Sequence, residues 1–252
     1  MRTALALCLL ATVPAADVHA QSLLISGGTL IDGTGRPPLE NAQVLVRDGV
    51  IAEITTAPPA AGDVERIDAR GKFVLPGFID SHVHYRDWKG ELFLAHGVTT
   101  VYDLGNPYYW QAALKHGFNS GRMRGPRYFF CGEIGLPSDE AAESQGPTVI
   151  HRGLDIIHKP DEASAIVERL RGAGVDCIKL NENFNGDLFS AIARAARGAG
   201  LRVISHSWNV SDSMRWGIGG VEHMEGIALA TATSPRAKEA IGRMHLEAGH
   251  KN

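Results

Sequence analysis

Two histidines separated by a single residue carry the strongest chemical signal in the sequence. They end the stretch PGFIDSHVH at positions 76–84, which has the character of a β-strand. Side chains two residues apart in a strand point to the same face, with Cα atoms roughly 6–7 Å apart. The imidazoles of His82 and His84 can therefore converge on one ion, and imidazole is a common ligand of Zn²⁺ and similar metals. A pair of polar residues at a strand end is the alternative for an isolated His-x-His motif.

Three further candidates lie at the ends of later strands. Lys179 ends the run VDCIK, His206 ends VISH, and His223 ends VEH. In a barrel of parallel strands, the carboxyl ends meet at one mouth and carry the chemistry. Each residue alone fits a structural role, such as a lysine in an ion pair or a hydrogen-bonded histidine. Together with the first pair, they predict one shared site.

Strands and helices alternate from Gly71 onwards. Strands are expected at 73–83, 99–104, 127–131, 175–180, 202–206 and 221–224. Helices are expected between them at 87–96, 108–116, 161–173, 186–199 and 211–216. Such alternation predicts an α/β fold, in which a parallel sheet is covered by helices.

The number of these units favours an incomplete (β/α)8 TIM-type barrel. About six βα units are visible, whereas a complete barrel has eight and typically about 250 residues. The segment from Gly77 to Asn252 has 176 residues. An open, doubly wound sheet of six strands is the alternative. On the barrel interpretation, residues 76–230 form the partial barrel and residues 231–252 form an atypical tail with one helix.

The segment at positions 21–75 is expected to form a small antiparallel β-domain. Short apolar runs are separated there by turns, and Asp32-Gly33 and Asp48-Gly49 are hairpin signals. The runs lie at 23–26, 29–31, 42–46, 50–54 and 64–67.

Residues 1–20 have the pattern of a secretory signal peptide. Arg2 gives a positive start, residues 4–13 are apolar, and Val18-His19-Ala20 provides the small residues that precede cleavage. An apolar stretch of this length is too short for a stable membrane anchor, and no later stretch is longer. We therefore expect an exported protein, periplasmic or secreted, without a membrane anchor once the signal is removed.

Two cysteines remain after the predicted signal peptide. Cys131 and Cys177 both fall on predicted strands. An exported protein meets an oxidising compartment in which disulfides persist. Two buried free thiols and one disulfide are both compatible with these positions.

The composition is that of an ordinary globular protein. Hydrophobic residues make up 44% of the 252 residues and charged residues 21%, which argues against disorder. The formal net charge is −3, so no excess of basic residues points to nucleic acid or an acidic membrane surface as a partner.

Three motifs together resemble the metal-dependent amidohydrolase superfamily. They are GGTLIDGTG at positions 27–35, PGFIDSHVH at 76–84 and GVTTVYDLG at 97–105. The resemblance is strongest to the imidazolonepropionase-like and Xaa-Pro dipeptidase-like branch, and it extends to about Ala230. It implies a barrel with a β-sandwich built from the segments before and after it.

The resemblance implies a site with two divalent metal ions, zinc or similar. His82 and His84 would bind the first ion, and His206 and His223 the second. Lys179 would be carboxylated by CO₂ and bridge them, because a carbamate is an anion with two oxygens whereas an ammonium would repel both cations. A shared water would become the nucleophile, and one ion would polarise the scissile carbonyl.

The implied reaction is hydrolysis of a C–N bond in a small amide, cyclic amide or dipeptide. Lys179 and His206 are the expected catalytic residues. The superfamily also uses an aspartate at the end of strand eight as a metal ligand and proton shuttle. No counterpart is found, because Asp212 precedes strand six and only 29 residues follow His223. We therefore expect a C-terminally truncated member with impaired activity.

Two other functions stay open. One is an inactive remnant that keeps metal-binding residues without turnover. The other is a Schiff-base enzyme in which the amine of Lys179 is the nucleophile, although this leaves the four histidines without a role. The oligomeric state is not predicted by any feature of the sequence.

Overall fold

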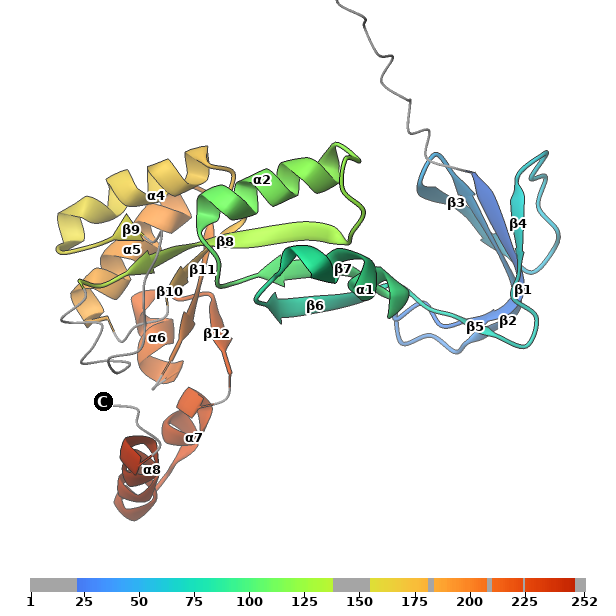
Figure 1. Cartoon of the computed structure of the whole chain (residues 1–252). Coiled ribbons are helices and arrows are strands. Elements are labelled where there is room, and N and C mark those ends of the chain that lie inside the picture. The colour runs from blue at the N-terminus through green and yellow to red at the C-terminus, as the bar shows by residue number, and fades with distance from the viewer. Residues whose placement is uncertain (1–21, 138–154, 181–183, 208–209, 224, 248–252) are drawn as a thin grey trace, which may run out of the picture. The chain divides into compact units, whose positions relative to one another are not determined.

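A computed structural model describes residues 22–137, 155–180, 184–207, 210–223 and 225–247 (Figure 1). The chain divides into two compact units, one ending at Pro76 and the other beginning at Gly77. The predicted signal peptide, residues 1–20, lies outside the described residues.

The first unit is a single five-stranded sheet. Its strands are β1 (Leu23–Leu30), β2 (Leu39–Arg47), β3 (Val50–Thr55), β4 (Glu65–Asp68) and β5 (Phe73–Val74). β1, β2 and β3 are antiparallel neighbours, as predicted. β4 and β5 pair parallel with β1, so the antiparallel prediction was wrong for these two. Leu24, Leu45 and Ala61 form the small core of this unit.

The two predicted turns of this unit differ. Asp48 and Gly49 have φ angles of 49° and 76° and join β2 to β3 directly, as a tight hairpin requires. Asp32-Gly33 does not form a two-residue hairpin, because the last pair before it joins Leu30 to Leu39. The carboxylate of Asp32 instead accepts hydrogen bonds from Thr34 and Arg36 within a longer loop.

The second unit is built on a parallel sheet of six strands in chain order. They are β6 (Phe78–Val83), β7 (Val98–Asp103), β8 (Arg127–Gly135), β10 (Cys177–Leu180), β11 (Arg202–His206) and β12 (Gly220–Glu222), with β9 (Asp155–Ile156) beside β8. A doubly wound sheet would reverse its strand order at a switch point. The order here never reverses, so the fold is the predicted incomplete TIM-type barrel. The strand expected at 73–83 is divided, since Phe73–Val74 belongs to β5.

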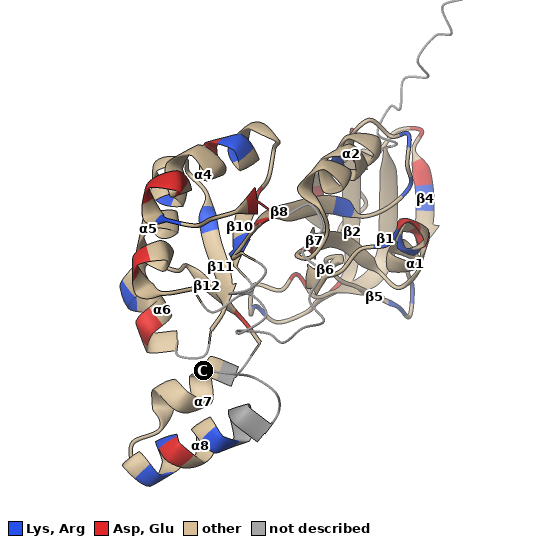
Figure 2. Ribbon diagram, turned by 60° about the vertical axis from the view of Figure 1, so that its left-hand side comes forward, with Lys and Arg blue, Asp and Glu red and all other residues tan. Residues whose placement is uncertain are grey.

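Helices follow the strands of this sheet (Figure 1). They are α1 (Gly90–Ala95) after the 3₁₀ turn η1 (Asp87–Lys89), α2 (Tyr108–Asn119), α4 (Ala163–Gly172) after η2 (Pro160–Glu162), α5 (Gly186–Gly198), α6 (Val210–Trp216), α7 (Glu225–Thr231) and α8 (Pro235–Glu247). α8 is the helix expected in the tail, whereas α7 was not predicted. Within the described ranges, no helix has both the length and the apolar composition needed to cross a membrane. Both signs of charge are interspersed along α4, α5 and α8 (Figure 2).

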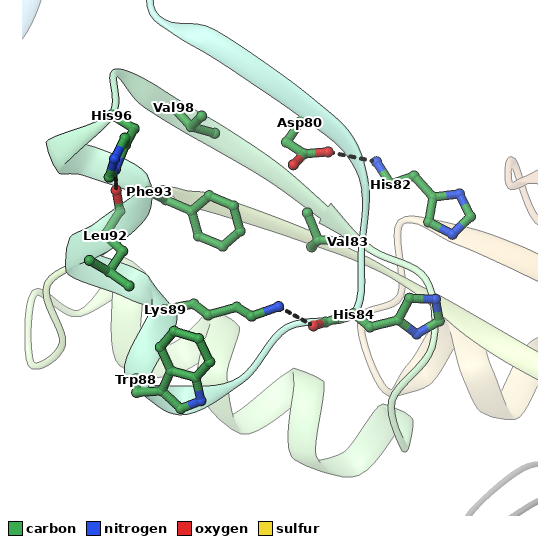
Figure 3. Close-up of a pocket in the computed structure, with 10 residues that line it drawn as sticks. All are labelled: Asp80, His82, Val83, His84, Trp88, Lys89, Leu92, Phe93, His96 and Val98. Atoms are coloured by element: carbon green, nitrogen blue, oxygen red, sulfur yellow. Dashed lines mark hydrogen bonds between the residues drawn. The ribbon is translucent and has the colours of Figure 1, made fainter.

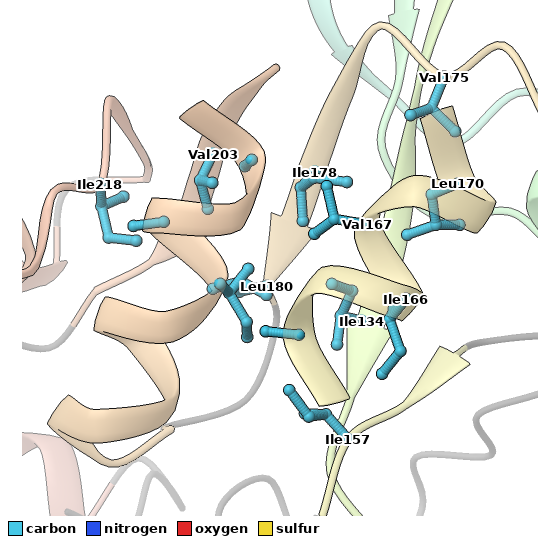
Figure 4. Close-up of a cluster of buried hydrophobic side chains, with 14 of the residues drawn as sticks. Ile134, Ile157, Ile166, Val167, Leu170, Val175, Ile178, Leu180, Val203 and Ile218 are labelled. Atoms are coloured by element: carbon cyan, nitrogen blue, oxygen red, sulfur yellow. The ribbon is translucent and has the colours of Figure 1, made fainter. Parts of the chain in front are cut away.

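The main core lies between the sheet and its helices. Alternate residues of the strands, such as Ile134, Ile178 and Leu180, are fully buried in it (Figure 4). α5 contributes an apolar face, and the side chain of Asn185 caps this helix by accepting from the backbone N–H groups of its first turn. The remaining alternate residues face the inside of the curled sheet.

A disulfide links two strands on that inner face. Cys131 of β8 and Cys177 of β10 are register partners with Cα atoms 4.4 Å apart, and their sulfurs are bonded. Of the two alternatives that the sequence left open, the structure has the disulfide. It cross-links the two strands at the centre of the sheet.

Replacing either cysteine by alanine should lower the free energy of unfolding by about 4 kcal/mol, because the cross-link is then lost from the unfolded chain. The two cysteines are 46 residues apart. The double variant should lose little more than each single variant, since either change removes the same bond. Urea unfolding without reductant measures this. Additive losses, together with two free thiols in the wild-type chain, would contradict the disulfide.

Candidate active site

The five predicted site residues all lie at the carboxyl ends of strands in the six-stranded sheet. His82 lies in β6 and His84 directly follows it, Lys179 lies in β10, His206 ends β11, and His223 directly follows β12. His82 and His84 project to the same side of β6, opposite Val83 (Figure 3). The two-residue alternation of the strand produces this arrangement.

The four imidazoles form a series of neighbouring rings. The ring centroids are 5.5 Å apart for His82 and His84, 4.9 Å for His82 and His223, and 4.9 Å for His206 and His223. β6 and β12 are the two edges of the sheet. Contact between His82 and His223 therefore requires the sheet to curl until its edges approach each other. The histidines of three strands meet inside that curl.

Glu222 fixes the orientation of the His82 ring. Its Oε2 lies 2.5 Å from Nδ1 of His82, and both side chains are mostly buried. A hydrogen bond from Nδ1 to a carboxylate leaves Nε2 free to act as a ligand, which is the usual arrangement of a metal-binding histidine. Within the described residues, no three His, Cys, Asp or Glu side chains already stand in metal-binding positions. The rings are close neighbours that would have to move together around an ion.

Gly105 provides the contact surface for His84. A Cβ atom at this position would lie 2.1 Å from Nδ1 of His84, so only glycine allows the ring to approach. Burial lowers the pKa of His84, while a hydrogen bond to the backbone of Gly105 opposes that change. The lowered pKa favours the neutral imidazole, which is the form that binds metals.

Lys179 is the most unusual residue of the site. Its side chain is 1% exposed, and its Nζ has no hydrogen-bond partner in the part of the chain that is described. Burial lowers the pKa of Lys179 to about 8, against the opposing charges of Glu222 and Glu133. A buried amine without a partner is costly unless it is neutral or binds a further group. Together with four imidazoles, it fits a site that holds metal ions and a carboxylated lysine.

Two acidic residues of the site were missed by the sequence analysis. Glu222 precedes His223 but was not considered. Glu133 is the register partner of Lys179 on β8, and burial raises its pKa to about 7. The sequence predicts a strand that ends at Cys131. β8 continues to Gly135, and its alternation places Glu133 on the same face as Cys131.

A cavity of about 560 Å³ adjoins the first two histidines (Figure 3). Besides His82 and His84, apolar side chains of η1 and α1 line it, among them Trp88, Leu92 and Phe93. The two imidazoles point away from these apolar side chains (Figure 3), so the cavity lies on the helix-covered side of β6 and not at the cluster of imidazoles.

Gly105→Ala should displace the His84 ring, because the new methyl group needs the space that the ring occupies. We expect a loss of about 1–3 kcal/mol in the free energy of unfolding and a changed imidazole ¹⁵N chemical shift for His84. Gly198→Ala is the control, since nothing lies within 4 Å of the added Cβ. Unchanged His84 shifts in the Gly105 variant would show that the ring does not pack on this glycine.

The lowered pKa of Lys179 predicts a pH dependence of stability. Between about 8, the pKa of Lys179 in the folded chain, and 10.5, the ordinary value, the unfolded state binds more protons. The free energy of unfolding should therefore rise with pH across this window, by at most about 3 kcal/mol. Urea unfolding of the metal-free chain measures it, and Lys179→Met should lack the rise. If the free energy of unfolding changes with pH in the same way for the wild-type chain and Lys179→Met, the lowered pKa of Lys179 is refuted.

Known proteins resemble this chain in sequence over part of their length. No family model matches it. A dihydroorotase of Citrifermentans bemidjiense is 44% identical over 199 residues, which is 74% of this chain and 42% of that protein. A deacetylase of Agrobacterium fabrum is 37% identical over 103 residues, 35% of this chain and 24% of that protein. The first relatives, uncharacterized mycobacterial proteins, are matched over only 14% of their length.

Solved structures resemble the chain over almost all of its length. Molinate hydrolase has a TM-score of 0.71 at 22% identity, and the match covers 91% of this chain and 62% of that one. A Xaa-Pro dipeptidase with bound methionine has a TM-score of 0.66 at 22% identity, with 91% and 65% covered. These matches show the same fold. The sequence relatives, a dihydroorotase and deacetylases among them, and the shared fold are both consistent with the resemblance to the amidohydrolase superfamily.

Proposed function

We propose that the chain carries the metal-binding part of a binuclear metallohydrolase that cleaves C–N bonds of small amides, cyclic amides or dipeptides. One observation carries the proposal: four imidazoles adjoin one another at the mouth of a curled sheet that also buries the amine of Lys179, which has no hydrogen-bond partner among the described residues. The names of its relatives, which include a dihydroorotase, a deacetylase and a Xaa-Pro dipeptidase, support this class of reaction. They also support the Xaa-Pro dipeptidase-like branch.

The residues divide into two pairs of ligands and a bridge. His82 and His84 would hold one ion, His206 and His223 the other, and Lys179 would bridge them as a carbamate. Divalent ions of the zinc type would acidify a water and polarise the scissile carbonyl. Glu222 would keep the Nδ1 proton of His82 in place, so that Nε2 of that ring faces the ion.

Lys179 is suited to react with CO₂. The neutral amine adds to the carbon of CO₂, an N–C bond forms as one C=O π bond opens and its electron pair moves to oxygen, and one proton of the nitrogen is released to solvent. Burial favours the neutral amine by lowering the pKa of Lys179 to about 8. The product is an anion, which divalent cations would stabilise in this interior.

The superfamily uses an aspartate at the end of strand eight as its proton shuttle. These 252 residues contain no counterpart of the aspartate at the end of strand eight. Loss of a general base typically lowers the rate by about 10²–10⁴-fold. Turnover measured on this chain alone should therefore be low.

Export from the cytoplasm is part of the proposal. Residues 1–20 have the pattern of a signal peptide, and the pairing of Cys131 with Cys177 suits an oxidising compartment. The periplasm and the extracellular medium both meet this condition.

The chain treated with Zn²⁺ and bicarbonate should bind two equivalents of zinc. His82→Ala and His206→Ala should each bind one equivalent or less, and Lys179→Met should lose the bridge and the second ion. His96→Ala is the control, because His96 lines the same cavity but its ring bonds to the carbonyl of Leu92. Metal analysis after gel filtration measures the stoichiometry. A wild-type chain without zinc would contradict the proposal.

Assays of the loaded chain separate the alternative functions. Slow hydrolysis of Xaa-Pro dipeptides, N-acetyl amino acids or dihydroorotate supports an enzyme, whereas two zinc equivalents without turnover support an inactive remnant. The lowered pKa of Lys179 also suits a Schiff-base nucleophile. Borohydride reduction with a carbonyl compound would then label Lys179 in the absence of metal.

A further inference from the structure

A buried carboxylate stands behind the site, on the other face of the sheet. Asp103 is the last residue of β7, and its side chain is fully buried. A carboxylate in such surroundings is stable only when several hydrogen bonds replace its lost water. The donors that surround Asp103 therefore show what this residue holds in place.

Those donors come from three separate segments. The hydroxyl of Tyr128, on β8, lies 2.5 Å from Oδ2, and the side-chain amide of Asn106 lies 2.8 Å from Oδ2 and 3.0 Å from Oδ1. The backbone N–H groups of Tyr85 and Gly105 point at Oδ1 from 3.3 and 3.4 Å. Asp103 thus joins the segments that follow β6 and β7 to strand β8.

Two of these donors flank His84. Tyr85 is the next residue in the chain, and Gly105 is the residue on which the imidazole packs and to which it hydrogen-bonds. Asn106 reinforces the same link, because its amide also donates to the carbonyl of Tyr85 at 3.1 Å. The backbone on both sides of the His84 ring is therefore attached to one carboxylate.

We propose that Asp103 is a positioning residue, which holds Tyr85 and Gly105 so that the ring of His84 presents its free nitrogen to a metal ion. Asp103 itself touches neither metal nor substrate. The inference rests on the proposed function, since it assigns His84 as a ligand. It also makes a statement about the metal-free chain, in which the same contacts are present.

Asp176 offers a matched comparison. It directly precedes β10, level with Phe130 of β8 as Asp103 is on β7, and accepts hydrogen bonds from Lys115 at 2.7 and 2.8 Å and from the backbone of Phe130 at 3.0 Å. None of these partners adjoins a predicted site residue. Asp103→Asn and Asp176→Asn therefore make the same chemical change, but only Asp103 is hydrogen-bonded to residues that contact His84.

The experiment measures Zn²⁺ affinity by competition with a chromogenic chelator, and the imidazole ¹⁵N shifts of His84 in the metal-free full-length chain. Asp103→Asn replaces an acceptor oxygen by an NH₂ group that meets the donors of Tyr128 or Asn106. We expect it to weaken the binding of one zinc ion by about 10–100-fold and to shift the His84 signals. Asp176→Asn should leave the Zn²⁺ affinity within twofold of wild type and the ¹⁵N shifts of His84 unchanged.

Equal effects of the two variants, or an unchanged Asp103→Asn, would overturn the inference. If Asp103→Asn does not fold, Tyr128→Phe takes its place, because it removes a single hydrogen bond to the same carboxylate. It should weaken zinc binding several-fold and shift the same signals, and a variant that behaves like wild type would overturn the inference. If the wild-type chain binds no zinc, the proposed function fails, and the His84 shifts alone decide the role of Asp103.

Discussion

Helices cover one face of the parallel sheet in the second unit. The alternation of side chains along its strands therefore determines which residues enter the core under the helices and which face the inside of the curl. Phe130, Ile178 and Leu180 enter the core under the helices, so their neighbours must face the inside of the curl. A shift of one residue would exchange the two sets and bury polar groups in the apolar core. The same packing that stabilises the fold therefore brings the imidazoles and the amine of Lys179 to the inner face.

Two buried ionisable residues lie on opposite faces of this sheet, one with a structural role and one in the proposed site. Asp103 faces the helices, and five hydrogen bonds satisfy its oxygens. Lys179 faces the interior, and its amine has no partner in the described residues. A satisfied buried charge stabilises the native arrangement, whereas an unsatisfied one destabilises it and is explained by a group that it can bind. The disulfide beside Lys179 holds its strand to β8.

Local patterns predicted most of the barrel and the strand-end positions of the five proposed site residues, because the strands are short apolar runs that end in histidine or lysine. Properties that depend on distant partners were not predictable in this way. The parallel pairing of β4 and β5 with β1, and the disulfide between Cys131 and Cys177, depend on registers between segments far apart in the sequence. Glu133 was missed because β8 continues to Gly135, past the end of the expected strand. The partners of Asp103 come from strand β8 and from the loops after β6 and β7, which only the folded sheet brings together.

Crystals of the chain treated with Zn²⁺ and bicarbonate, measured at the zinc absorption edge, would locate the ions themselves. Two anomalous peaks about 3.5–4 Å apart are expected, each about 2.0–2.1 Å from imidazole nitrogens, with added density on Nζ of Lys179 between them. Peaks elsewhere on the surface, or unmodified Lys179 beside an inner face without ions, would contradict a binuclear centre formed by His82, His84, Lys179, His206 and His223.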